Sequence, residues 1–198
     1  FYYFCVNIYF LKFFYYILFF CILSCEQAEK SISYNIEFQN YENSDKKYFL
    51  DSISSTLINY KNDSLKSKLL FKVAEEYFYL GENEQSLKIS KLALIDAKSR
   101  HDSISIGRAL YYAGDCFLDY QKDSAYYYYK ESEKVFRKLN NKDKLALVLY
   151  NKAYLLFYEG NYIESEIEVI KALNYLKNNG KLITKYRCYS LQGSNHLE

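Results

Sequence analysis

The sequence predicts an all-α fold, a solenoid of about three complete helix-turn-helix repeats followed by a partial fourth. Three stretches of the chain align with one another: residues 69–94, 109–136 and 148–176. Their small residues Ala74, Gly114 and Ala153 are 40 and 39 residues apart, and Gly193 follows after another 40. A period of this length is typical of repeat architectures, in which each unit buries its apolar face against its neighbours.

Each unit has the pattern of two helices joined by a turn. The first unit carries a helical stripe that consists of Leu70, Val73, Ala74 and Tyr77. Gly81 then interrupts the pattern, and a second stripe follows, with Ser86, Ser90 and Ala93 at helical spacing. The third unit repeats the spacing with Gly160, Ser165 and Ala172. Small residues on the stripes would let the two helices of a unit approach closely.

The middle unit contains four consecutive tyrosines, 126–129, which the repeat pattern explains. Ala125, Tyr129 and Ser132 take the small, aromatic and small places of the second helix. Successive residues of a helix point about 100° apart. We therefore expect Tyr129 in the core, Tyr127 toward water, and the remaining two tyrosines beside the buried stripe.

This unit resembles the tetratricopeptide repeat (TPR), over roughly residues 67–198. The family places a small residue in the first helix, an aromatic three later, glycine at the turn, and two alanines seven apart in the second helix. The chain departs from the family in three ways: its period is near 40 rather than 34, proline is missing after the second helix, and the middle unit is one residue short between Gly114 and Ala125. The resemblance implies a TPR-like superhelix whose first helices line a concave face.

Loop residues support a division of the chain into units. Asp63, Asp102 and Asp143 precede the three first helices, where a carboxylate can accept hydrogen bonds from free amides. Asn178, Asn179 and Gly180 would stop the third unit. We expect the following segments: a capping helix over 45–61, repeats over 65–100, 103–140 and 143–178, and the first helix of an incomplete fourth repeat over 181–198, after which the natural protein is expected to continue.

The N-terminal 25 residues are almost entirely apolar. Lys12 precedes an apolar run, 13–23, which is followed by Ser24 and Cys25. This order is that of a secretory signal, and its end resembles a bacterial lipobox, which implies lipidation at Cys25. An uncleaved membrane anchor, an ordinary signal and a buried core helix are the alternatives. All but the last place the protein outside the cytoplasm, in the periplasm or at the cell surface, with residues 26–44 as a polar tether from the membrane.

The composition excludes several classes of function. Beyond the signal segment the chain is almost neutral, so it offers no field that would attract nucleic acid. His101 and His196 have no second histidine or cysteine at zinc-ligand spacing, and the six glycines form no phosphate-binding run. Cys116 and Cys188 lie two repeats apart, so we expect two free thiols. We therefore expect no enzyme, no catalytic residue, no metal and no cofactor.

What remains is a surface for a protein or peptide. Placed on the TPR pattern, the inward positions of the first helices are Phe71, Glu75, Tyr79, Arg108, Tyr111, Asp115, Asp119, Tyr150, Tyr154 and Tyr158. The first hypothesis is a non-catalytic scaffold, exported and tethered to the membrane through its N-terminus only, that binds its partner in this groove. The second is the extracytoplasmic input region of a signalling protein, a histidine kinase or a helix-turn-helix transcriptional regulator, whose effector follows residue 198. Such architectures are familiar among TPR-like proteins of AT-rich bacteria of the Bacteroidetes kind.

Overall fold

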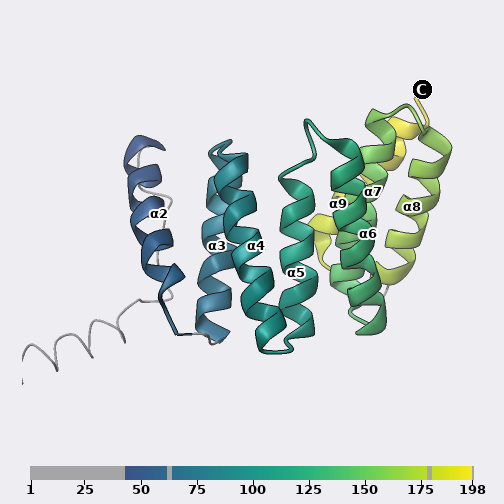
Figure 1. The fold of residues 1–198 in the computed structure, drawn as a ribbon. Helices are drawn as coiled ribbons and strands as arrows, with labels where there is room; N and C mark the ends of the chain where they lie inside the picture. The colour runs from purple at the N-terminus through teal and green to yellow at the C-terminus, as the bar shows by residue number, and fades with distance from the viewer. Residues whose placement is uncertain (1–42, 62–63, 178–179, 198) are drawn as a thin grey trace, which may run out of the picture. The chain divides into compact units, whose positions relative to one another are not determined.

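The computed structural model describes residues 43–61, 64–177 and 180–197, which fall in one compact unit, Tyr41–Glu198. Eight helices lie in these ranges (Figure 1): α2 (Asn43–Ile58), α3 (Ser64–Tyr79), α4 (Asn83–Ser99), α5 (Ser103–Asp115), α6 (Lys122–Lys138), α7 (Lys142–Tyr158), α8 (Tyr162–Leu176) and α9 (Leu182–Asn195). The described residues form no strand, which confirms the all-α prediction. The signal segment, Cys25 and most of the expected tether lie outside the described residues.

Helices that follow one another along the chain pack against one another. Contacts join α2 to α3, α3 to α4, and so on in chain order to α9, and Figure 1 shows this order for α3 to α6. In addition, α3 contacts α5 and α7 contacts α9. Since these are the first helices of neighbouring units, the arrangement is the one expected for a helical repeat solenoid.

The helix expected to cover the first unit begins earlier than the sequence pattern predicts. We expected it over 45–61, and α2 spans Asn43–Ile58. Its Leu50 and Leu57 are fully buried. The hydroxyl of Tyr77 in α3 donates a hydrogen bond of 2.6 Å to the Asp51 carboxylate. This bond and the apolar contacts fix α2 to α3.

Small side chains hold the helix pairs close together, as the pattern predicts. Ala93, Ser132 and Ala172 on the second helices are completely buried, as are Ala74 and Ala153 on the first helices. The middle unit shows why bulk is excluded: a Cβ added to Gly114 would lie 2.6 Å from the ring of Tyr129. Normal contacts between carbon atoms are about 3.5–4.0 Å. Tyr129 is therefore the core residue of the tyrosine run, and Gly114 makes room for it.

Serines at the helix contact also form hydrogen bonds. In the first unit, Ser86 donates to the carbonyl of Ala74 at 2.7 Å, and in the third, Ser165 donates to the carbonyl of Ala153 at 2.9 Å. In the middle unit Ser132 donates to the carbonyl of Gly107 at 2.8 Å. A hydroxyl here satisfies its own hydrogen bond inside the core and ties the two helices together. The small size of these residues was expected, whereas their hydrogen bonds were not.

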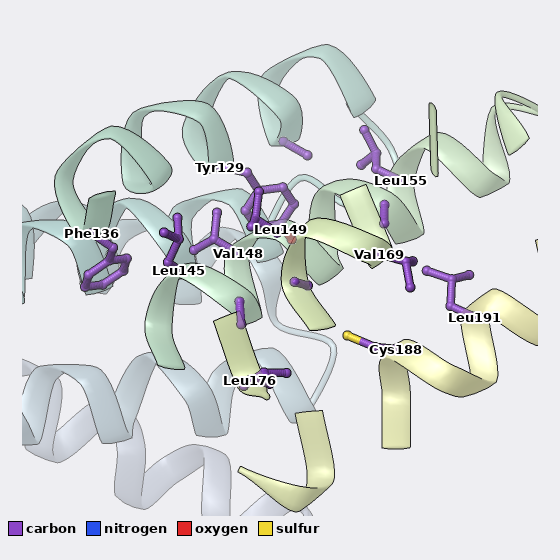
Figure 2. Close-up of a cluster of buried hydrophobic side chains, with 14 residues drawn as sticks. Tyr129, Phe136, Leu145, Val148, Leu149, Leu155, Val169, Leu176, Cys188 and Leu191 are labelled. Atoms are coloured by element: carbon purple, nitrogen blue, oxygen red, sulfur yellow. The ribbon is translucent and has the colours of Figure 1, made fainter. Parts of the chain in front are cut away.

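The core continues from the second helix of the middle unit through the third unit into the fourth. Figure 2 labels ten of the 14 residues that form it, from α6, α7, α8 and α9: Tyr129, Phe136, Leu145, Val148, Leu149, Leu155, Val169, Leu176, Cys188 and Leu191. Neither Cys188 nor Cys116 forms a disulfide, and both are buried. The expectation of two free thiols is confirmed for the described part of the chain.

Four of the turns between helices share one backbone pattern. At each turn an amide bonds to the carbonyl five residues before it: Glu82 to Tyr77, Asp102 to Ala97, Asn141 to Phe136, and Asn161 to Leu156. The residue before each of these amides has positive φ: Gly81, His101, Asn140 and Gly160. This is the pattern of a Schellman stop. Because the chain contains no proline, these turns, and not a proline, end the helices.

The turn inside the middle unit differs because it has no residue at positive φ. The helix α5 ends at Asp115, and residues 116–120 continue as a succession of turns. The amide of Phe117 bonds to the carbonyl of Gly114, and that of Gln121 bonds to the carbonyl of Phe117. Without a residue at positive φ, the chain reverses over more residues and the first helix is shorter.

Two expectations need correction. Asp143 does not cap the third unit, because it lies within α7; the side chain of Asn141 accepts the hydrogen bond from Lys144 instead. Asp102 does cap α5, and Asp63 lies outside the described residues. Gly193 does not occupy a packing position, since it is exposed and a Cβ there would meet nothing within 4 Å. In α9 the buried face is formed by Thr184, Cys188 and Leu191.

Candidate binding site

A cavity of about 410 Å³ lies between the first helices α3, α5, α7 and α9. Five of the ten expected groove residues line it: Glu75, Tyr79, Arg108, Tyr111 and Asp115. They come from α3 and α5, and the opposite wall comes from α7 and from the start of α9. The register of the repeats therefore brings these residues together in space.

Three more of the expected residues line a second cavity, of about 330 Å³. Asp119, Tyr154 and Tyr158 are found there with Lys122, whose ammonium donates to the carbonyl of Tyr158 at 3.0 Å. The rings of Tyr154 and Tyr158 lie 4.6 Å apart, and Tyr150 extends this row at 6.2 Å from Tyr154. Tyr158 is exposed. The second cavity is thus bordered by an aromatic row along α7.

Phe71 does not present a surface to a ligand, contrary to expectation. Its side chain is 1% exposed and belongs to the core. The Arg108 guanidinium lies 4.2 Å from its ring centroid, and Tyr112 stacks on it at 5.7 Å. The ring of Phe71 therefore holds the Arg108 guanidinium in position through a cation–π contact. The TPR pattern identified the correct helix but not the depth of this side chain.

The carboxyl group of Asp115 is the centre of a hydrogen-bond network in the first cavity. It accepts from the hydroxyl of Tyr129 at 2.6 Å and from the side-chain amide of Asn151 at 2.8 Å. The same amide donates to the hydroxyl of Tyr111 at 3.0 Å. Since these partners belong to α5, α6 and α7, the network joins three helices.

The network does not fully compensate the burial of the carboxylate. Burial raises the pKa of Asp115 to about 7, and the negative charge of Glu75 adds to this rise, although the bonds from Tyr129, Tyr111 and Asn151 oppose it. Burial also raises the pKa of Tyr111 and Tyr129 well above the ordinary value, so both phenols stay protonated and available as donors.

Cationic side chains line the other part of the same cavity: Arg108, Lys144, Lys181 and Arg187. Within the described ranges none of the four has a carboxylate within 4.0 Å. Burial lowers the pKa of Lys144, and the positive charges of Arg108 and Lys181 lower it further, although the negative charges of Glu75 and Asp143 oppose this shift. These cations repel one another in a partly enclosed space.

Sequence reasoning missed Lys144, Lys181, Arg187 and Asn151. Asn151 lies between Leu149 and Ala153 but outside the buried stripe of α7. The two lysines lie near a helix start, where no pattern distinguishes them from solvated lysines. The signal that identifies them is the cavity itself, which requires four helices to be in place. A search among the described residues for three or more potential metal ligands close together finds none.

Cys116 is buried, donates to the hydroxyl of Ser86 at 3.2 Å, and has its pKa raised to about 11 by burial. It therefore stays a thiol at neutral pH.

No family model matches the chain, and no curated protein matches it either. No helix among the described residues has the length and the apolar character that crossing a membrane requires.

Proposed function

We propose that this chain is a non-catalytic TPR-type binding module that holds a protein or peptide in the surface formed by its first helices. The observation that supports it most is the cavity of about 410 Å³ between α3, α5, α7 and α9, where aromatic rings and unpaired charges are accessible together. Rigid aromatic side chains with a polar end are suited to recognition. The row formed by Tyr150, Tyr154 and Tyr158 would extend the contact toward the second cavity.

Binding to an array of random peptides tests the proposal. Tyr79→Ala and Tyr154→Ala remove rings that line the two cavities, and we expect each to weaken the binding of array hits about ten-fold or more, since a well-packed aromatic anchor contributes on the order of 2 kcal/mol. Tyr127→Ala is the matched control, because Tyr127 is exposed on α6 and lines neither cavity.

Tyr111→Ala is a poorer test than the sequence suggests. The ring of Tyr111 packs against Tyr112 and Tyr129, and its hydroxyl accepts from Asn151. Its loss would disturb the core as well as the surface. If Tyr79→Ala, Tyr154→Ala and Tyr127→Ala all bind the array hits as the parent does, the proposed surface is not the binding surface.

We further propose that the module is exported and tethered to the membrane through a lipid on Cys25. The support is the sequence of residues 1–25, which ends in Ser24-Cys25 after an apolar run. Expression of the full chain in a bacterium with radiolabelled palmitate should label the parent and not the Cys25→Ala variant, while Cys21→Ala stays labelled. Equal labelling of the parent and Cys25→Ala would exclude lipidation at this residue.

A further inference from the structure

The cavity between the first helices has two poles of opposite charge. Arg108, Lys144 and Lys181 form what is here called the positive pole, and Glu75 and Asp115 form the negative pole. All five line the one cavity of about 410 Å³, as does a fourth cation, Arg187. The inference below rests on the proposed function and specifies the partner of that site.

The positive pole lacks a counter-ion. No carboxylate of the described chain lies within ion-pair distance of Arg108, Lys144 or Lys181. The Nε atom of Arg108 is buried and has no hydrogen-bond partner. Buried donors and charges are normally paired, because an unpaired one carries its full desolvation cost. An anionic group in the cavity would supply the missing partner.

Neither carboxylate of the negative pole forms an ion pair with a residue in the described part of the chain. Tyr129 and Asn151 donate hydrogen bonds to Asp115 but are neutral, so they do not compensate its charge. Glu75 accepts only a long bond of 3.4 Å from Tyr79, and none of the ion pairs of the described residues includes it. The two carboxylates act on each other, since the charge of Glu75 raises the pKa of Asp115. A cation placed between them would stabilise both.

The spacing of the poles follows from the helices that carry them. Arg108 and Asp115 are seven residues apart on α5, and so are Lys144 and Asn151 on α7. At a rise of 1.5 Å per residue, seven residues correspond to about 10 Å along each helix. An extended peptide spans about 3.3–3.6 Å per residue, so about three of its residues cover this distance.

We infer that the cavity binds a bipolar peptide segment, with an acidic side chain at the positive pole and a basic side chain about three residues away at the negative pole. A uniformly acidic peptide would bring a carboxylate against Glu75 and Asp115, and a uniformly basic one would meet the four cations that line the cavity. Charge complementarity therefore favours opposite charges in one ligand over either single sign.

The test uses acetylated and amidated hexapeptides labelled with a fluorophore. One pair carries glutamate and lysine three positions apart, in both orders; matched peptides replace the glutamate, the lysine or both by glutamine. Fluorescence anisotropy with the full chain measures the affinity. We expect at least one bipolar order to bind, and loss of either charge from it to weaken binding about ten-fold, as charge-assisted hydrogen bonds of about 1.5 kcal/mol imply.

Variants of the protein assign each charge to its pole. In Lys144→Gln, replacing the peptide's glutamate should weaken binding less than it does with the parent protein, because only part of the positive pole remains, while replacing its lysine should weaken binding as much as before. In Glu75→Gln the reverse is expected. Lys130→Gln and Glu164→Gln are the controls, because both residues are exposed on second helices, outside the cavity. They should bind all peptides as the parent does.

Two results overturn the inference. One is equal affinity for the bipolar and the fully neutral peptides, and the other is tighter binding of a peptide that keeps only one of the two charges. The random-peptide array separates this failure from failure of the proposed function. If array peptides bind through Tyr79 and Tyr154 without a bipolar pattern, the binding module stands and the bipolar ligand is wrong; if no array peptide binds, both are wrong.

Discussion

Replacement of Gly114 by alanine should destabilise the fold, although alanine is the better helix former. Gly114 lies in α5, and a Cβ at this position would lie 2.6 Å from one ring carbon of Tyr129 and 2.7 Å from another. Overpacking of a buried site costs about 1–3 kcal/mol. The change from glycine to alanine in a helix gains about 0.5–1 kcal/mol. The middle of each range gives an expected net loss of about 1 kcal/mol in the free energy of unfolding.

The chain supplies a matched control for this substitution. Gly193 is also helical, in α9, but it is exposed and a Cβ there would meet nothing within 4 Å. Gly193→Ala should stabilise the protein slightly or leave it unchanged. Urea unfolding followed by far-ultraviolet circular dichroism measures both variants against the parent. If Gly114→Ala is as stable as Gly193→Ala, the close approach of α5 and α6 is wrong.

Three further predictions concern a turn, an ion pair and a buried carboxyl group. His101 has φ of 54°, which glycine adopts without strain, so His101→Gly should raise the free energy of unfolding by about 1 kcal/mol. Lys98→Gly, inside α4, should lower the free energy of unfolding by about 1 kcal/mol. Thermal unfolding that shows no difference between the two variants would contradict this. Lys152 is 5% exposed, and its ammonium lies 2.7 Å from the carboxylate of Glu133 and 3.5 Å from that of a second glutamate. Lys152→Met would leave both carboxylates without this partner and should lower the free energy of unfolding by about 2 kcal/mol. Chemical denaturation at neutral pH measures this loss. The pKa of Asp115 is raised to about 7 from an ordinary 3.8, so the folded state binds this proton more tightly than the unfolded state does. The free energy of unfolding should therefore fall as pH rises from about 4 to 7. Unfolding measured across this range should show a flatter pH profile for Asp115→Asn than for the parent, and an unchanged slope would refute the burial argument.

The repeat pattern predicted the fold because it reports packing directly. Ala93, Ser132 and Ala172 return at a nearly constant period, and only a contact between helices requires small residues at that period. The same logic separated Tyr129 from Tyr127, which are fully buried and 59% exposed respectively.

Positions where packing is not periodic could not be predicted in this way. Asn141, not Asp143, caps α7. Both side chains can accept a hydrogen bond from a backbone amide and they lie close together in the sequence, so the sequence pattern does not show at which of them the helix begins. Gly193 continued the period in sequence but lies on the exposed side of α9, where its small size serves no contact.

The candidate site was only partly predictable for a related reason. Arg108, Tyr111 and Asp115 were expected on one face because they share a helix. Lys144 and Lys181 approach them only after α7 and α9 have packed, and a lysine near a helix start carries no sign of such a neighbour. The opposition of charges in the cavity is thus a property of the tertiary structure.

The central claim is that a ligand lies in the cavity between the first helices, and lysine footprinting tests it most directly. The protein would be acetylated with a lysine-reactive reagent with and without a saturating array peptide, and each site quantified by mass spectrometry. We predict protection of Lys144 and Lys181, which line the cavity, and unchanged modification of Lys130 and Lys88, which are exposed on second helices. Protection of Lys130 and Lys88 with no change at Lys144 and Lys181 would contradict the claim.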